Sequence, residues 1–212
     1  VVAVTLKKNN TLNYEGLGLN SGDIIQGLYP GISAATVTHQ AVTNSVFFEG
    51  DFFWGGVSPV NGYGNLTNVV VGPTNADAFA GFTITPSSPS NHVHLISFDI
   101  ATKDDGLGDP SFTVYVQDAN NFILSSPFVS VTGDLNPNTH TFVNFGGSPV
   151  NGPIGQSLSV YWPASNGRVG VDNVQFEIVA FEFISPPVIL SLTGVGTTNV
   201  VLTWSAISNQ IY

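Results

Sequence analysis

The sequence contains no cysteine and very few cationic side chains. Without cysteine it can form no disulfide and offers no thiolate as a nucleophile or metal ligand. Lys and Arg together number 4 against 14 acidic residues, which gives a formal net charge of -10. Because nucleic-acid binding depends on clustered cations, this composition argues against a nucleic-acid partner. The acidic excess instead suits divalent cations and solubility.

Long apolar runs are missing as well. No run reaches the roughly 18 residues of a membrane-spanning helix. No signal peptide is recognisable and the chain begins with Val1, so we expect a processed N-terminus, with simple trimming as the alternative. Ala, Leu, Glu and Lys do not recur at helical spacing, which excludes an amphipathic helix of three turns.

What the sequence has in excess is the composition of short strands joined by tight turns. Gly (23) and Pro (13) are frequent, and Val, Thr, Phe and Ile dominate the remainder. Many short strands separated by turn residues are typical of a β-sandwich or barrel. The expected strands are Val2–Leu6, Thr11–Tyr14, Ala35–Val42, Ser45–Phe48, Asn68–Val71, Ala78–Thr85, His92–Ile100, Ser111–Gln117, Phe122–Val131, His140–Phe145, Ser157–Trp162 and Gly170–Phe183.

Alternation within three of these strands predicts which side chains face the core. Each shows apolar residues at every second position, as half-buried antiparallel strands do. The predicted apolar faces are Ile96, Phe98 and Ile100; Phe112, Val114 and Val116; and Val174, Phe176 and Ile178.

A series of short motifs resembles a known type of secreted module. The motifs are Leu12–Leu17, Gly22–Ile25, Tyr29–Ile32, Leu95–Ile100, Phe112–Ala119 and Gly170–Phe176. In this order they resemble the bacterial jelly-roll modules found with PEP-CTERM sorting tails, and they are similar to galactose-binding-like carbohydrate-binding modules. The resemblance covers about residues 10–180, through short motifs and without the sorting tail itself. It implies an all-β, antiparallel jelly-roll β-sandwich.

The same resemblance implies a structural calcium ion, and matching motif positions make Glu15 and Asp172 its ligands. Alternation places Asp172 on the face of Val174 and Phe176, pointing inward, where a carboxylate needs a cation or several hydrogen bonds. Backbone carbonyls would have to complete a calcium shell of roughly six to eight oxygens. The alternative is that Asp172 caps a turn or sits at a bulge.

A second acidic stretch, Lys103–Asp109, lies between two expected strands and contains Asp104, Asp105 and Asp109. These carboxylates offer a second, weaker calcium site. The stretch lacks the spacing and the terminal Glu of an EF-hand loop, and we favour a solvated hairpin turn.

The segment Glu49–Asn65 is the richest candidate for ligand recognition. Sugar sites combine aromatic ring faces with carboxylates or amides that bind hydroxyls, and this segment has both on a Gly-rich backbone. Two other interpretations are favoured, a loop that folds its aromatics over the open end of the sandwich or a protein contact. The candidate ligand-binding residues are Asp51, Phe52, Phe53, Trp54 and Tyr63.

His92 and His94 lie two residues apart on one face of an expected strand. This spacing occurs in cupin metal sites, but a metal would need further ligands, such as His39 or His140, brought close by the fold. No Glu follows to complete a cupin pattern, and solvated histidines at a strand end are the favoured interpretation.

Residues 186–212 carry two apolar strand runs, Val188–Thr193 and Asn199–Trp204, that resemble the first two strands of a fibronectin type III domain. Two strands alone are marginally stable in water, so we expect them to pair with the body of this chain or with another copy. We therefore divide the chain into a sandwich (1–185) and a C-terminal strand pair (186–212), a domain fragment or strand-exchange segment.

No catalytic constellation emerges from the sequence. It has neither a G-x-S-x-G motif nor a phosphate-binding loop, and nothing selects two of its carboxylates as a glycosidase pair. The first hypothesis is a non-catalytic structural or adhesive protein of a bacterial surface or matrix, self-associating through its C-terminal strands into a filament. The alternative is a calcium-stabilised carbohydrate-binding module of a larger secreted enzyme. Both place the protein outside the cell, where few Lys and Arg leave few sites for trypsin-like proteases.

Overall fold

A computed structural model describes most of the strand-forming parts of the chain. The described residues are 2–15, 17–19, 23–25, 32, 34–41, 47–50, 63–64, 66–72, 79–103, 112–120, 124, 129–131, 140–145, 149–163, 169–184, 189–195 and 199–204. Within these residues the chain divides into two compact units, Lys7–Ala180 and a second unit of Val1–Leu6 with Phe181–Tyr212. None of the described segments is a helix long and apolar enough to cross a membrane.

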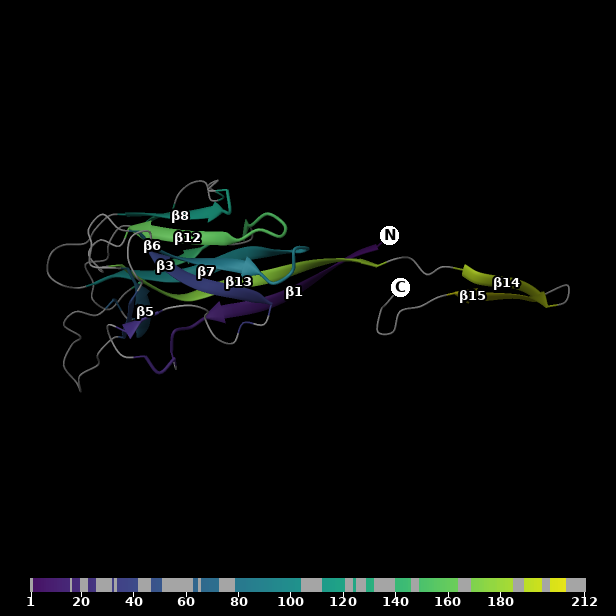
Figure 1. The fold of residues 1–212 in the computed structure, drawn as a ribbon, viewed down its shortest axis with the longest axis horizontal. Helices are drawn as coiled ribbons and strands as arrows, with labels where there is room; N and C mark the ends of the chain where they lie inside the picture. Colours follow the sequence, from purple (N-terminus) through teal and green to yellow (C-terminus); the bar gives the residue numbers. More distant parts are fainter. Residues whose placement is uncertain are drawn as a thin grey trace. The chain divides into compact units, whose positions relative to one another are not determined.

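One layer of the sandwich is an eight-stranded sheet with the order β10-β7-β13-β5-β4-β2, in which β1 also pairs with β13 and β11 with β7 (Figure 1). The pairs whose register is defined are antiparallel. Its strands are β1 (Val2–Leu12), β2 (Asp23–Ile24), β4 (Phe47–Gly50), β5 (Asn68–Val71), β7 (Asn91–Thr102), β10 (Thr141–Asn144), β11 (Val150–Asn151) and β13 (Val169–Ile184).

The other layer is a five-stranded antiparallel sheet with the order β3-β6-β12-β8-β9. Its strands are β3 (Ala35–Ala41), β6 (Phe79–Pro86), β8 (Phe112–Asp118), β9 (Val129–Val131) and β12 (Leu158–Pro163). Both sheets contribute apolar side chains to one buried cluster, which makes the fold an antiparallel β-sandwich, as the sequence predicts. From the five-stranded sheet come Val37, Ala80, Phe82, Ile84, Val114, Val116, Leu158, Val160 and Trp162.

Two opposed bulges interrupt the ladder between β7 and β13. Asp172 lies opposite Asp99, Gln175 opposite Ser97, and Phe176 opposite Leu95, so each strand carries one extra residue in turn. The overall register of the two strands is unchanged. On each strand, however, the positions that face the core change from odd to even numbers, or from even to odd, at the bulge. On β13 the core residues are Val169 and Val171, then Val174, Phe176 and Ile178; on β7 they are Ile100 and Phe98, then Leu95 and Val93.

The bulges correct two sequence-based assignments. Phe98 and Ile100 do face the core, but past the bulge Leu95 continues it, and Ile96 was wrongly placed on that face. Asp172 is buried as predicted, with 3% of its surface exposed. Its neighbour Val171 belongs to the core, so Asp172 points to the opposite, outer face of the sheet. Asp172 lies directly before the bulge of β13, a position that the alternative interpretation of this residue includes.

A second, smaller apolar cluster covers part of that outer face. Gly170 of β13 lies under it, and a side chain there would meet the ring of Tyr63 and the methyl groups of Val69. The absence of a side chain at Gly170 lets the two residues pack directly on the sheet. The cluster consists of Tyr63, Leu66, Val69, Val71 and Ala101.

The C-terminal runs form the predicted strands β14 (Ile189–Val195) and β15 (Asn199–Trp204), which pair antiparallel as a two-stranded sheet. Within the described residues the other predicted strands are also present, and two short strands were missed. Val2–Leu6 and Thr11–Tyr14 merge into β1, and β9 is the described strand part of the predicted Phe122–Val131, of which residues 122–123 and 125–128 lie outside the described residues. The two strands that the sequence did not indicate are β2 and β11, each of two residues.

Candidate functional site

The outer face of the five-stranded sheet carries two tyrosines side by side. Core residues alternate with outward ones along β8 and β12, which directs Tyr115 and Tyr161 outward. The register places Tyr161 directly opposite Tyr115 on one side and opposite Gly81 of β6 on the other. Both tyrosines are partly exposed. We call this surface, with Phe79 and the polar residues around it, the tyrosine face.

Gly81 creates the space for one of the rings. A side chain at position 81 would collide with the ring of Tyr161 and with the backbone oxygen of Val160. The bare backbone therefore lets the Tyr161 ring lie over β6. Phe79 extends the row, because its ring meets that of Tyr115 edge-on with centroids 6.3 Å apart and planes at 64°.

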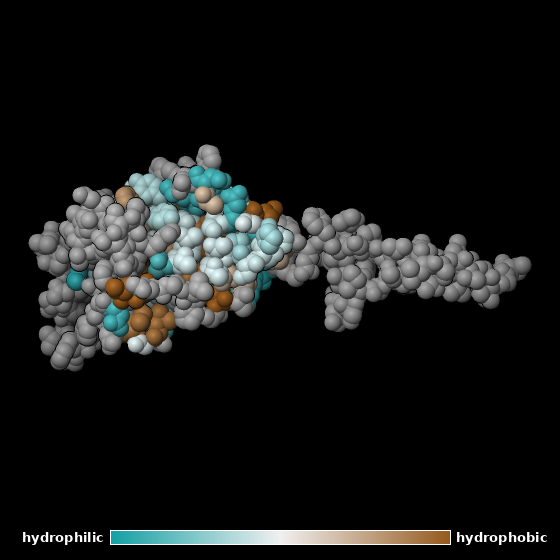
Figure 2. Space-filling view, viewed as in Figure 1, coloured by the Kyte–Doolittle hydropathy of each residue, from teal (hydrophilic) through white to brown (hydrophobic). Residues whose placement is uncertain are grey.

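Hydroxyl and amide groups surround the rings. The hydroxyls of Thr83 and Ser159 lie 2.8 Å apart across β6 and β12, and Thr85 and Ser157 repeat that pairing at 2.8 Å. Gln117 of β8 lies opposite Ser159 on the same face. In the view of Figure 2 the coloured surface over these strands is mostly pale, the colour of near-neutral residues such as Thr, Ser, Tyr and Gly. Donors, acceptors and aromatic faces are thus combined without charge.

The second feature is a buried carboxylate on the eight-stranded sheet. The Oδ1 atom of Asp172 is inaccessible and has no hydrogen-bond partner. Burial raises the pKa of Asp172 to about 6, with the nearby Asp99 and Glu15 charges adding to the rise. The backbone N–H groups of Asn173 and Tyr14 act in the opposite direction. An unpaired oxygen on a carboxylate this deeply buried is costly unless a cation meets it.

Side chains from three places in the chain contact the surrounding carboxylates. Glu15, just after β1, accepts a hydrogen bond of 2.8 Å from the Thr67 hydroxyl. Asp99 accepts one of 2.9 Å from the Asn173 amide, and its other oxygen lies 3.4 Å from His140 Nε2. Glu15 and Asp172, the two predicted calcium ligands, thus lie in one electrostatic environment. No group of three or more His, Asp or Glu side chains among the described residues is arranged to hold a metal by itself.

Comparisons with known proteins yield structural neighbours only. No family model and no curated protein sequence matches the chain. A cyclase from Fischerella sp. aligns with 80% of this chain and 96% of its own, at 15% identity and a TM-score of 0.42. A family 11 carbohydrate-binding module of a Clostridium thermocellum cellulase aligns with 75% and 95%, at 13% identity and a TM-score of 0.31.

A third neighbour is a Podospora anserina mannanase that includes a carbohydrate-binding module of family 35. The alignment covers 74% of this chain but only 29% of the mannanase, at 15% identity and a TM-score of 0.37. Because these TM-scores lie below 0.5, we base the functional proposal on the residues of this chain alone. The link to PEP-CTERM-associated modules stays a prediction.

Of the predicted ligand-binding residues, the structure describes one. Tyr63 is only 2% exposed and packs in the outer cluster, with Lys103 Nζ 5.8 Å from the centre of its ring. A sugar could stack on Tyr63 only if that packing opened. The remaining predicted residues lie outside the described part of the chain, namely Asp51, Phe52, Phe53 and Trp54 of the aromatic segment and Asp104, Asp105 and Asp109 of the second acidic stretch.

The sequence did not single out the tyrosine face. Alternation places Tyr115 and Gln117 on the face opposite the apolar residues of their strand, so the outward direction of these two side chains could be predicted from the sequence. What could not be predicted was the register of β12 between β6 and β8, which brings Tyr161 beside Tyr115 from 46 positions away. Sequence alternation cannot supply that register, because it depends on which strands become neighbours.

Proposed function

We propose that this chain is a non-catalytic, extracellular carbohydrate-binding module whose ligand lies on the tyrosine face. The observation that carries the proposal is the in-register pair Tyr115–Tyr161, with the Tyr161 ring positioned over Gly81. Aromatic faces pack against the C–H faces of sugar rings, while the Thr, Ser and Gln side chains beside them exchange hydrogen bonds with hydroxyls. An open sheet surface suits a stretch of polysaccharide laid across the strands.

The test is glycan binding by aromatic variants. Native affinity electrophoresis against soluble plant and bacterial polysaccharides would identify a ligand, and calorimetry would give its affinity. Y161A and Y115A should each weaken binding at least tenfold. F142A is the matched control, because Phe142 is an aromatic side chain, 55% exposed, on β10 of the other sheet. Retained binding in both tyrosine variants would overturn the proposed site.

The same assay separates the tyrosine face from the aromatic segment that the sequence suggested. W54A should leave binding unchanged if the ligand lies on the tyrosine face. Loss of binding in W54A, with Y115A and Y161A unaffected, would move the site to Asp51–Tyr63. A chain that binds none of the polysaccharides tested would contradict the carbohydrate proposal at both places.

Calcium is proposed as a structural ion of this module. Two observations support this proposal: Asp172 offers an unpaired buried oxygen, and Glu15 is a second carboxylate in its electrostatic environment, so that backbone carbonyls would complete the shell. When bound, the ion would offset the buried negative charge and stabilise the sheet without taking part in any reaction.

Thermal unfolding in calcium and in chelator tests this assignment. Calcium at about 100 times its Kd should stabilise the wild-type chain by about 2.7 kcal/mol, a rise in Tm of several degrees. D172N should lose most of that calcium response and, in chelator at neutral pH, be no less stable than wild type, because it buries no charge. An equal calcium response in both chains would rule out Asp172 as a ligand.

A second candidate function is self-association through the C-terminal hairpin. Among the described strands, β14 and β15 pair only with each other, which leaves a backbone edge on each strand. Such an edge can accept a strand from another copy, and a head-to-tail contact of this kind produces filaments. Carbohydrate binding and assembly are independent properties, and each has its own test.

A further inference from the structure

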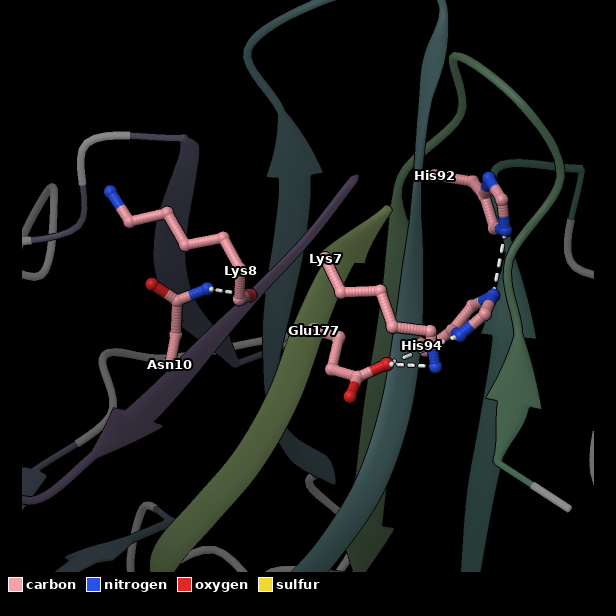
Figure 3. Close-up of polar contacts among 6 residues, drawn as sticks. All are labelled: Lys7, Lys8, Asn10, His92, His94 and Glu177. Carbon is pink, nitrogen blue, oxygen red and sulfur yellow. Dashed lines mark hydrogen bonds and ion pairs between the residues drawn. The ribbon is translucent and has the colours of Figure 1, made fainter. Parts of the chain in front are cut away.

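His92 and His94 form a directly hydrogen-bonded pair of imidazoles on the outer face of the eight-stranded sheet. Their Nε2 atoms are 2.7 Å apart, and the ring centroids are separated by 4.5 Å with an angle of 57° between the planes (Figure 3). The neighbouring core residues Val93 and Leu95 point to the opposite face. The two rings therefore project from the same side of β7 at the spacing of alternate strand residues.

A carboxylate and an ammonium group complete a row across three strands. Glu177 of β13 lies opposite His94 in the register, with its Oε2 atom 3.6 Å from His94 Nδ1. The same oxygen is 3.0 Å from the Nζ atom of Lys7 on β1. Figure 3 shows dashed lines from the Glu177 carboxylate to both Lys7 and His94, and a further one from His94 to His92.

The surroundings of both imidazoles favour the neutral form. Burial lowers the pKa of His92, and for His94 burial is again the largest cause, reinforced by His92 and Lys7 and opposed by Glu177. Neutral imidazole is the form that binds metals, and histidine is the commonest protein ligand for late first-row ions. The short Nε2–Nε2 contact means that one ring donates and the other accepts.

We propose that His92 and His94 form a two-imidazole chelate for a late first-row transition-metal ion, with Cu²⁺ or Ni²⁺ preferred over Zn²⁺. The ring that donates the shared hydrogen would change to its Nδ1–H tautomer, which leaves both Nε2 lone pairs free for the ion. No proton is gained or lost overall, since a neutral imidazole carries one N–H in either tautomer. Water would occupy the remaining coordination positions.

The metal preference follows from the general affinity order of divalent ions, and the distance between the two nitrogens is compatible with it. With metal–nitrogen bonds of about 2.05 Å, a right angle at the metal requires nitrogens about 2.9 Å apart, whereas a tetrahedral angle requires about 3.3 Å. The observed 2.7 Å is closer to the right angle. Tetragonal geometry is typical of Cu²⁺ and Ni²⁺ and tetrahedral geometry of Zn²⁺, and Cu²⁺ also binds most tightly in the general affinity order.

Glu177 is the supporting residue of this site. A carboxylate facing Nδ1 of His94 favours the tautomer with the hydrogen on Nδ1 and so presents Nε2 to the ion, as in carboxylate–histidine–metal arrangements. Lys7 competes for the same carboxylate oxygen. The other histidines lie in different surroundings, His39 beside Tyr14 and His140 beside Asp99. The chelate therefore consists of two imidazoles, unlike the oxygen-rich calcium site.

Metal titration of the chelator-treated chain tests the proposal. Calorimetry with CuCl₂, NiCl₂ and ZnCl₂ in separate runs should show one equivalent bound, with affinity falling in the order Cu²⁺, Ni²⁺, Zn²⁺. H92Q and H94Q should each lower the affinity for Ni²⁺ at least tenfold, and H140Q should match wild type. Wild-type affinity in H92Q and H94Q, or no binding by wild type, would overturn the assignment.

Two further measurements complete the test. The first needs no variant and so does not depend on whether the variants fold, and the second tests the role of Glu177. In the unaltered chain, Cu²⁺ should broaden the ring NMR signals of His92 and His94 before those of His140. Broadening centred elsewhere would contradict the site. E177Q should weaken Ni²⁺ binding by about tenfold, whereas K7M, which frees the carboxylate, should bind at least as tightly as wild type. An unchanged affinity in E177Q would remove Glu177 from the site.

Discussion

At the scale of single residues, burial displaces the pKa values of an acid and a base in opposite directions. The pKa of Asp172 is raised to about 6 and the pKa of His39 is lowered to about 4, because in both cases a low-dielectric interior disfavours the charged form. His39 is enclosed by the aromatic rings of Tyr14 and Phe82, and its Nε2 atom lies 2.8 Å from the Tyr14 hydroxyl.

His39 should make the stability of the sandwich depend on pH. Its folded pKa of about 4 lies below the 6.5 of an unfolded chain, so only the unfolded state gains a proton between these values. Stability is therefore fully present above pH 6.5 and declines as the pH falls to 4, by about 3 kcal/mol from this group. Urea unfolding at several pH values would measure the decline.

The matched comparison for this prediction is H39Q against H140Q. Asp172 contributes a trend of the opposite sign between about pH 6 and 4, so the difference between wild type and variant is the informative quantity. That difference should shrink by about 3 kcal/mol between pH 6.5 and 4 for H39Q, whereas H140Q measures the effect of replacing a histidine elsewhere in the chain. A constant difference for H39Q would show that His39 titrates normally in the folded chain.

Gly81 provides a second prediction at this scale. G81A should displace the Tyr161 ring, because the added methyl group collides with it and with the backbone of β12. We expect a loss of about 1–3 kcal/mol in stability, as in other overpacked sites, and a loss of glycan binding comparable with that of Y161A. G152A is the control, since a methyl group at Gly152 meets its neighbours at ordinary contact distances of 3.4–3.6 Å. Full binding by G81A would show that the ring position is unimportant.

At the scale of elements, the paired bulges of β7 and β13 determine where the polar groups lie. Asn173 adopts a left-handed backbone with φ of 50°, a conformation that costs most non-glycine residues energy. Its side chain compensates by donating to Asp99. The bulge on β13 thus brings Asp172 and Asn173 together with Asp99 on the outer face of the sheet.

Asn173 variants should separate backbone strain from the hydrogen bond. N173G removes the amide group but tolerates the left-handed conformation, whereas N173A loses the amide and keeps the strain. Chemical denaturation should therefore rank wild type above N173G, and N173G above N173A by about 1 kcal/mol. Equal stability of the two variants would mean that the bulge relaxes when Asn173 is replaced.

The elements also show how far sequence reasoning reaches. Alternation found the core faces of β8 and the second half of β13 because each strand has an uninterrupted period of two. It failed at Ile96 and at the orientation of Asp172, because a bulge adds a residue without leaving a sequence signal. The burial of Asp172 was still predicted, and the bulge was recognised as the alternative. The register between neighbouring strands places Tyr161 beside Tyr115 and Glu177 beside His94, and no local sequence pattern encodes that register.

At the scale of the whole molecule, the sandwich and the C-terminal hairpin are expected to be separable. Truncation after Ser185 should leave the sandwich folded, with its thermal unfolding changed little, because the main core lies within Lys7–Ala180. Circular dichroism and thermal melts of the truncated chain would measure this. A truncated chain that does not fold would show that the hairpin belongs to the sandwich.

Particle size decides whether the hairpin serves assembly. Light scattering and negative-stain microscopy of the full chain, with and without calcium, should show polymers or a defined oligomer if strands are exchanged, and the truncated chain should be monomeric. A full chain that is monomeric under both conditions would leave carbohydrate binding as the only proposed function.

The two opposed bulges also constrain how this sheet can change in evolution. Losing the extra residue from β13 alone would leave the bulge on β7 uncompensated, so the two strands would be shifted by one residue relative to each other over half of the ladder. Losing one residue from each strand together would restore a regular ladder in which the same residues face the core. Insertions and deletions at these two points, about 75 residues apart in the chain, should therefore occur in pairs among homologues.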